Sequence, residues 1–153
     1  PLWRARRRPG HDAAAARGRR PTAASDMYGV VSDHADAWYV TTENAVLHVS
    51  AAGRVRRVAT LEGVNLRGIA INPDDSALFV ADMGGHQILQ VEAATGTVTT
   101  LAGSGEGGDT DAVGGTAQFY FPCGVAISPG GSALFVADQG NHKIRRVEVA
   151  TGA

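Results

Sequence analysis

Two residue pairs combine side chains that often bind metals or move protons. Asp82 precedes His86 by four positions, and Asp138 precedes His142 by the same distance, 56 residues further along the chain. Carboxylate and imidazole groups do acid–base or metal chemistry when several converge on one point. Each pair here lies within its own copy of a similar sequence, so the copies keep the pairs apart. We therefore predict structural roles, with both side chains bonding the backbone of their turns.

A glycine-rich segment, 104–118, carries three acidic residues, Glu106, Asp109 and Asp111. Closely spaced aspartates can coordinate Ca²⁺, but the glycine and the distal glutamate of an EF-hand loop are missing. The lysine that follows the glycines of a phosphate-binding loop is missing too. We expect a flexible connection without a metal, of the kind that often contacts a ligand.

A long internal repeat determines how these residues are positioned. Residues 68–96 and 124–152 align without a gap and are identical at 19 of 29 positions. A weaker copy occupies 29–55, where Thr42 replaces the aspartate of the better copies. Matching residues are therefore expected at matching places in successive structural units.

Each copy predicts four short strands. In the second copy they are expected at about 68–72, 77–81, 87–92 and 97–102. The breaks between them are rich in Pro, Gly, Asn and Asp, which favour turns. The first two strands are nearly continuous apolar runs, as expected when both faces of a sheet are covered. Four-stranded antiparallel sheets in series indicate an all-β fold, the β-propeller, in which each blade packs on its neighbours.

The two better copies resemble a known family. The segment 136–147, VADQGNHKIRRV, is similar to the core of an NHL repeat. The segments 121–126 and 99–103 resemble the entry to the innermost strand of such a repeat and its outer end. The resemblance covers about 27–153. It implies a β-propeller, usually six-bladed in the full protein, of which this chain would supply about three blades.

The blades are expected at about 27–63, 64–118 and 119–153. The third copy stops before its fourth strand, and three blades cannot close a ring. Open sheet faces and an unpaired strand edge favour aggregation. We therefore expect further blades to close the ring, either from a longer parent protein, which we favour, or from other copies.

Residues 1–26 differ in composition from the rest. They hold seven arginines and two aspartates, a net charge of +5, whereas the remaining residues hold seven basic and thirteen acidic groups, a net charge of −6. We predict a disordered basic tail, or one that results from a wrong gene boundary. The composition also fits an organelle transit segment, or binding to nucleic acid or another anionic surface through charge. No signal-peptide core or transmembrane segment is predicted, and the compartment stays open.

In a propeller the innermost strands line a central channel, where one residue from each blade can contribute to a site. The residues directly before the first glycine of each copy are Tyr28, Arg67 and Cys123. Lactonase-like propellers place acidic or amide metal ligands at such points, and this set suits a hard divalent cation poorly. Arg67 could bind an anionic group. Cys123, which is the single cysteine and excludes an internal disulfide, is expected to be a small apolar residue rather than a reactive thiol.

These observations favour an interaction or scaffold module that presents propeller loops to a protein or another ligand. We assign no catalytic residue, cofactor or metal. The alternative is a propeller enzyme, a lyase or a lactonase-like hydrolase, whose catalytic residues lie in blades outside this sequence. Nucleic-acid binding is not expected for the acidic propeller part, because it usually requires a strongly basic surface.

Overall fold

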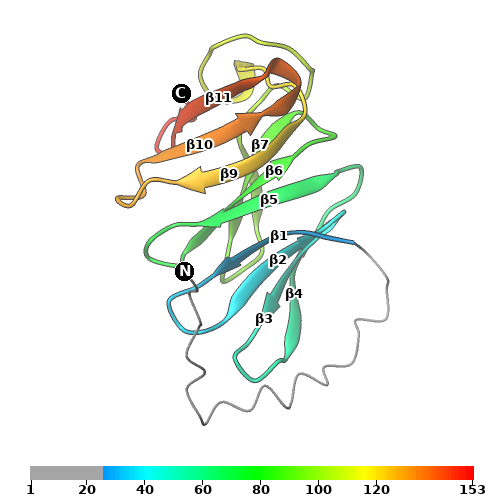
Figure 1. Ribbon diagram of the computed structural model, residues 1–153, viewed down its shortest axis with the longest axis vertical. Coiled ribbons are helices and arrows are strands. Elements are labelled where there is room, and N and C mark those ends of the chain that lie inside the picture. The colour runs from blue at the N-terminus through cyan, green and yellow to red at the C-terminus, as the bar shows by residue number, and fades with distance from the viewer. Residues whose placement is uncertain (1–25) are drawn as a thin grey trace, which may run out of the picture.

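The computed structural model describes residues 26–153 as three antiparallel sheets stacked in an arc (Figure 1). The tail predicted over 1–26 lies, except for its last residue, outside the described residues. Within each sheet the strands follow the order of the chain. The predicted all-β fold, an incomplete β-propeller, is confirmed. No helix in residues 26–153 is long and apolar enough to cross a membrane.

We call the sheets blades 1, 2 and 3. The strands of blade 1 are β1 (Met27–Ser32), β2 (Trp38–Thr42), β3 (Ala45–Val49) and β4 (Val55–Thr60). Those of blade 2 are β5 (Leu66–Ile71), β6 (Ala77–Asp82), β7 (Gln87–Glu92) and β8 (Val98–Ala102). Those of blade 3 are β9 (Pro122–Ile127), β10 (Ala133–Asp138) and β11 (Lys143–Glu148). Two short 3₁₀ helices, η1 (Gly114–Thr116) and η2 (Gln139–Asn141), complete the described elements.

The first strands of the blades, β1, β5 and β9, lie side by side along one side of the arc (Figure 1). Their close approach depends on glycine. A Cβ atom at Gly29 would lie 2.7 Å from the carbonyl oxygen of Arg67, and one at Gly68 would lie 2.8 Å from that of Cys123. At Gly124 the nearest atom would be in the same blade, 3.5 Å away. The repeated glycine therefore allows neighbouring blades to approach closely. In blade 3 the equivalent residue, Gly124, has no described blade on its outer side.

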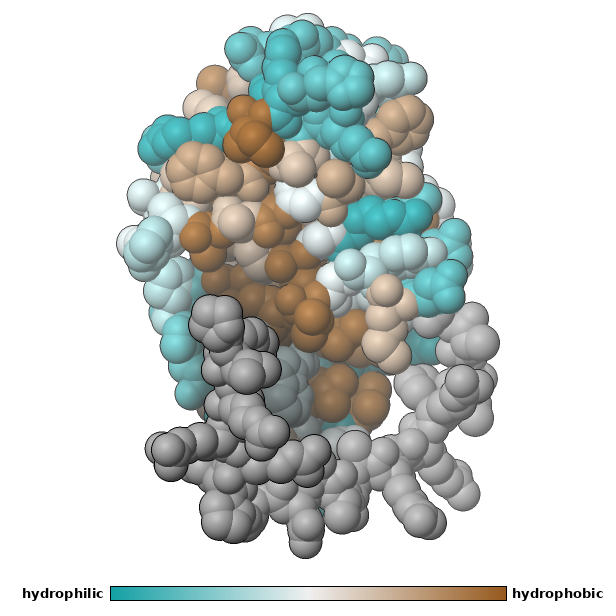
Figure 2. Space-filling view, in the orientation of Figure 1, coloured by the Kyte–Doolittle hydropathy of each residue, from teal (hydrophilic) through white to brown (hydrophobic). Residues whose placement is uncertain are grey.

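Two apolar layers hold the blades together. Side chains alternate along each strand, so neighbouring residues enter different layers. On β6, Leu78 and Val80 pack in the layer shared with blade 1, whereas Phe79 and Ala81 pack in the layer shared with blade 3. Because both faces of blade 2 are covered, every residue of β6 is buried. Apolar side chains also gather over the middle of the arc in the space-filling view (Figure 2).

The repeat permits a direct comparison of the same residue in a covered and an open face. Phe79 is 1% exposed, whereas its counterpart Phe135 is 43% exposed. Ile88 is fully buried, whereas its counterpart Ile144 is 71% exposed. The outer face of blade 3 thus carries the residues that blade 2 uses to hold its neighbour, and no described residue covers it.

At the far end of β1, Asp33 closes the turn into β2. Its Oδ1 atom accepts hydrogen bonds from the backbone N–H groups of Ala37, at 2.8 Å, and Ala35, at 2.9 Å. The Ala37 N–H is the main reason that the pKa of Asp33 lies below its usual value, with smaller contributions from Ala35, His48 and His34, against the opposing effect of burial. The same turn reaches blade 2, because His34 Nδ1 lies 2.8 Å from Asp75 Oδ1.

Substituting Phe79 and Phe135 should have unequal effects. Phe79→Ala removes a buried ring and should lower the free energy of unfolding by about 3–5 kcal/mol. Phe135→Ala, which makes the same change on the open face, should cost less than about 1 kcal/mol. Urea unfolding of the two variants measures both values. Equal losses would mean that the outer face of blade 3 is covered in solution.

Acid should weaken the turn at Asp33. Because its pKa is lower in the folded protein, its contribution is present above the unfolded pKa of about 3.9 and is lost as the pH falls through the folded value. Asp33→Asn should therefore cost about 1 kcal/mol at neutral pH and make stability less dependent on pH below about 4. Asp36→Asn, in the same turn, is the control, and an identical acid profile for both variants would contradict the assignment. Urea unfolding from pH 7 to pH 3 provides the measurement.

Candidate binding site

Two buried aspartates shape the end of the arc at which β1, β5 and β9 begin, here called the entry end. Asp82 Oδ1 accepts the backbone N–H groups of Asn65, at 2.9 Å, and Gly85, at 3.0 Å. Asp138 Oδ1 accepts the N–H of Tyr120 at 2.7 Å. Each carboxylate therefore ties the turn after the second strand to the chain entering the first strand of the same blade. In both residues the Oδ1 atom is thus engaged by backbone N–H groups, which is a structural role.

Thr42 stands at the corresponding place in blade 1. Its Oγ1 atom accepts the N–H of Ala45, 3.1 Å away, so it bonds only within its own turn. The hydroxyl group is too short to reproduce both contacts of the aspartates.

His86 connects two blades. Its backbone is left-handed, with φ of 54°, and its Nδ1 atom accepts the N–H of Phe121 at 3.1 Å. The sequence predicted a bond within the turn of the histidine, whereas the structure shows one to the entry of the next blade. His142 has the same backbone conformation, with φ of 55°, but no described residue follows blade 3 to meet it.

Three rings gather where His86 meets blade 3. The centroid of the Tyr120 ring lies 4.5 Å from that of Phe121, and His86 lies 5.6 Å from Tyr120 and 4.8 Å from Phe121. Phe121 has a φ of 54°, which is rare for a bulky residue and is typical of functional or tightly constrained sites. We call these three residues the aromatic cluster.

Phe121 is an additional residue relative to blade 2. In blade 2 the residue bonded by the buried aspartate, Asn65, directly precedes β5. In blade 3 the bonded residue is Tyr120, and Phe121 intervenes before β9. The left-handed turn accommodates this residue and leaves its ring partly exposed. The gapless alignment of the copies begins at Gly68 and Gly124 and so does not include this residue.

Of the three predicted channel residues, the structure brings two together. The guanidinium carbon of Arg67 lies 3.7 Å from the centre of the Tyr28 ring, a cation–π contact between blades 1 and 2. Arg67 Nη1 donates a hydrogen bond to its neighbour, the carbonyl of Leu66, at 3.1 Å. Cys123 instead directs its sulfur to the carbonyl of Ala137 in its own blade, at 3.7 Å.

Missing blades do not account for all exposed aromatic residues. Tyr28, Tyr120 and Phe121 are 40%, 42% and 38% exposed. Each contacts a residue of blade 2, either Arg67 or His86, so each lies at a junction that is already closed. All three lie at the entry end. This end therefore carries exposed rings where further stacking of blades would not cover them.

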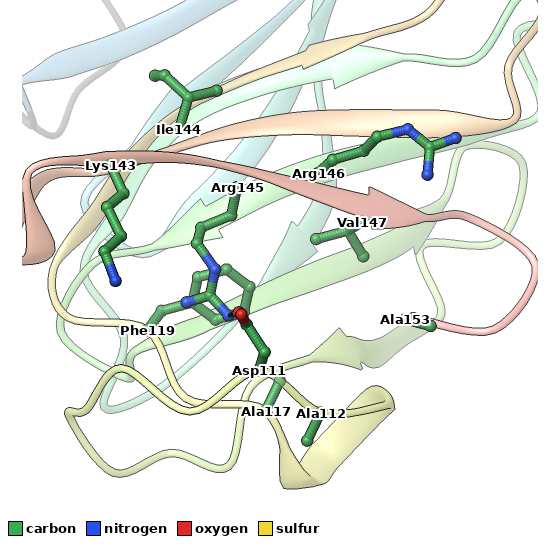
Figure 3. Close-up of a pocket in the computed structure, with 11 residues that line it drawn as sticks. Asp111, Ala112, Ala117, Phe119, Lys143, Ile144, Arg145, Arg146, Val147 and Ala153 are labelled. Carbon is green, nitrogen blue, oxygen red and sulfur yellow. Dashed lines mark hydrogen bonds and ion pairs between the residues drawn. The ribbon is translucent and has the colours of Figure 1, made fainter.

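The segment 104–118 is held against blade 3 (Figure 3). Arg145 pairs with Asp111 and with Asp138, the latter at 3.1 Å, and its Nη1 atom donates to the carbonyl of Gln118 at 2.9 Å. This segment was expected to be a flexible connection, and the structure shows an anchored loop instead. Two further side chains of blade 3 bind it: Lys143 pairs with Asp109, and Asn141 donates to the carbonyl of Gly108.

The acidic residues of the loop do not converge on a cation. Asp109 and Asp111 point to basic side chains of blade 3, as the preceding contacts show. Within residues 26–153 no group of three or more potential metal ligands is present.

A cavity of about 410 Å³ lies between the loop and β11, lined by Asp111, Phe119, Arg145, Val147 and other residues (Figure 3). In blade 2 the third strand pairs with β8, whereas β11 has no fourth strand among the described residues. The cavity therefore follows the free edge of blade 3. We interpret it as the place of a fourth strand, not as a site for a small ligand.

Arg145→Leu, which installs the residue that blade 2 has at this position, should release the loop. It leaves the buried Asp138 without its guanidinium partner, and the expected cost is about 2–4 kcal/mol. Amide hydrogen exchange in 104–118 should become faster. Arg146→Gln, which also installs the residue of blade 2, removes only an exposed pair with Glu148 and should cost less than about 1 kcal/mol. Unchanged exchange in Arg145→Leu would contradict the anchoring role.

Comparison with known proteins identifies related repeats. No model of a known protein family matches the chain. A segment of 85 residues, 55% of the chain, is 34% identical to human NHL repeat-containing protein 2 and covers 12% of it. Another of 79 residues, 52% of the chain, is 37% identical to the Arabidopsis thaliana protein SUPPRESSOR OF QUENCHING 1, chloroplastic, and covers 7% of it. The matches thus span a small part of these curated relatives.

Solved structures show the same fold. An auxiliary nutrient binding protein from Bacteroides thetaiotaomicron superposes with a TM-score of 0.66 and 18% identity, over 78% of this chain and 33% of that one. A streptogramin B lyase superposes with a TM-score of 0.64 and 18% identity, over 86% of this chain and 40% of that one. At this identity the similarity concerns the fold alone.

Proposed function

Because this chain is an incomplete β-propeller of NHL-type repeats, we propose that it serves as an interaction module whose binding surface is the entry end of the arc. The observation that carries the proposal is the exposure of Tyr28, Tyr120 and Phe121 at junctions that are already closed. Exposed aromatic residues on a rigid framework are typical of binding surfaces, where they supply contact area at a low cost in entropy.

The anchored loop supports the same proposal. Segment 104–118 is bound by side chains of blade 3 beside the aromatic cluster, and a Cβ atom at Gly107 would lie 2.8 Å from the Tyr120 ring. A loop that is ordered before binding loses less conformational entropy on association. The strained backbone of Phe121 is also consistent with a functional position.

The ligand of this surface is proposed to be a protein, with further blades completing the ring. The exposed faces of blades 1 and 3 fit that arrangement, because blade 3 repeats the residues with which blade 2 holds its neighbour. In the solved propellers, the aligned part covers less than half of the chain, so the rest of each chain lies beyond the three matched blades.

An enzyme of the lyase or lactonase type is not favoured. It would need free catalytic groups, and the two buried aspartates of the repeat already bond to backbone N–H groups. The similarity to a streptogramin B lyase is one of fold. We accordingly propose a binding role without catalysis for this part of the propeller.

Selection of peptides from a random phage-displayed library tests the proposal without a known partner. Peptides enriched on the unmodified chain should lose binding at least tenfold on the double variant Tyr120→Ser, Phe121→Ser. They should be retained by Phe135→Ser, which removes an equally exposed ring from the open face of blade 3. Hydrogen exchange of the double variant should confirm that the blades remain folded.

Two outcomes would overturn the proposal. One is enrichment of peptides that bind the double variant as well as the unmodified chain but fail on Phe135→Ser, which would identify the open face as the adhesive surface. The other is the absence of any enriched peptide.

A further inference from the structure

Arg67 differs from the other basic residues of the arc in its surroundings. Among residues 26–153, Arg67 and Arg145 are the basic residues that are partly buried, and the others are exposed. Arg145 pairs with two carboxylates. Arg67 lies within ion-pair distance of no carboxylate in the described part of the chain, and the one hydrogen bond of its side chain goes to the carbonyl of its neighbour Leu66.

A shortage of carboxylates does not explain this isolation, because residues 27–153 carry a net charge of −6. A guanidinium group has five donors arranged to bind planar oxyanions. Partial burial makes an unpaired charge costly. A partly buried guanidinium with most of its donors unused is therefore suited to an anion that arrives from outside.

The surroundings of Arg67 hold it in place. The Tyr28 ring lies 3.7 Å from its guanidinium carbon and shields one face of the group from water. Its backbone carbonyl accepts a hydrogen bond from Thr41 Oγ1 of blade 1, at 2.5 Å. Blades 2 and 3 have alanine, Ala81 and Ala137, at the position of Thr41. This bond between blades is thus specific to the junction that carries Arg67.

We infer that Arg67, held by Tyr28 and Thr41, is an oxyanion-binding point that recognises a carboxylate or phosphate group of the ligand at the entry end. The inference rests on the proposed function, because it names the chemistry of a ligand for the same surface. Arg67 would supply parallel N–H donors to two oxygens of the anion. Tyr28 would keep the guanidinium in position and limit its hydration.

Titration of the whole chain with anions tests the assignment. The probes are sodium phosphate and sodium acetate, with sodium chloride at equal ionic strength as the reference, and the readout is the NMR signal of the Arg67 Nε–H group. We expect a saturable shift with phosphate or acetate that chloride does not produce. The stronger of the two responses tells whether the site prefers phosphate or carboxylate.

Variants distinguish specific binding of an anion at Arg67 from nonspecific electrostatic attraction of anions to the protein. Arg67→Gln should abolish the response, which is then read from the Tyr28 ring signals. Arg67→Lys should weaken binding at least threefold, because lysine keeps the charge but lacks the planar set of N–H donors that binds two oxygens at once. Tyr28→Leu should also weaken binding. Arg57→Gln, which removes an exposed arginine on β4, should leave the affinity for the anion unchanged.

A response at Arg67 that chloride reproduces, or that Arg57→Gln reduces as much as Arg67→Lys does, would overturn the inference. So would the absence of a saturable shift in the unmodified chain. Peptide binding through the aromatic cluster is read independently. Enriched peptides without an anion response would leave the interaction module in place and refute only the role of Arg67.

Discussion

A four-stranded sheet with apolar residues on both faces is not stable alone in water, and in residues 26–153 the sheets cover one another's apolar faces. Blade 2 shows the result when both faces are covered, since every residue of β6 is buried. Blade 3 shows the result when one face is open, since Phe135 is exposed where Phe79 is buried. Packing between blades is therefore the source of stability. It also sets the distances between residues of different blades.

The contacts between blades determine how the residues of the entry end are positioned. The repeated glycine lets β1, β5 and β9 approach so closely that a carbonyl of the next blade occupies the space of a side chain. Buried aspartates then fix where the chain enters the first strand of blades 2 and 3. His86 joins this entry to the preceding blade. The backbone of Tyr120 and Phe121 is consequently bonded to blade 3 through Asp138 and to blade 2 through His86.

Much of the fold could be predicted from the repeat, because its spacing and turn residues are local properties of the chain. In the second copy the predicted strands differ from the observed ones by at most two residues, as at β5, which begins at Leu66 instead of 68. Contacts between blades were beyond such reasoning. The pairing of Arg67 with Tyr28 depends on the distance between two sheets, and the left-handed backbone of Phe121 contradicts the preference of a bulky residue.

The differences between the two best copies are as informative as their identities. Both copies must form the same strand pairs and stack in the same way. A position that differs between them can therefore make contacts that are specific to its own blade. Asn141, Lys143 and Arg145 differ from their counterparts in blade 2, and all three bind segment 104–118. Arg67, whose counterpart is Cys123, lies next to the repeat and bonds to no carboxylate of its own arc. Residues shared by the two copies therefore build the blades, and residues that differ, such as Asn141, Lys143 and Arg145, give one blade contacts that the other lacks.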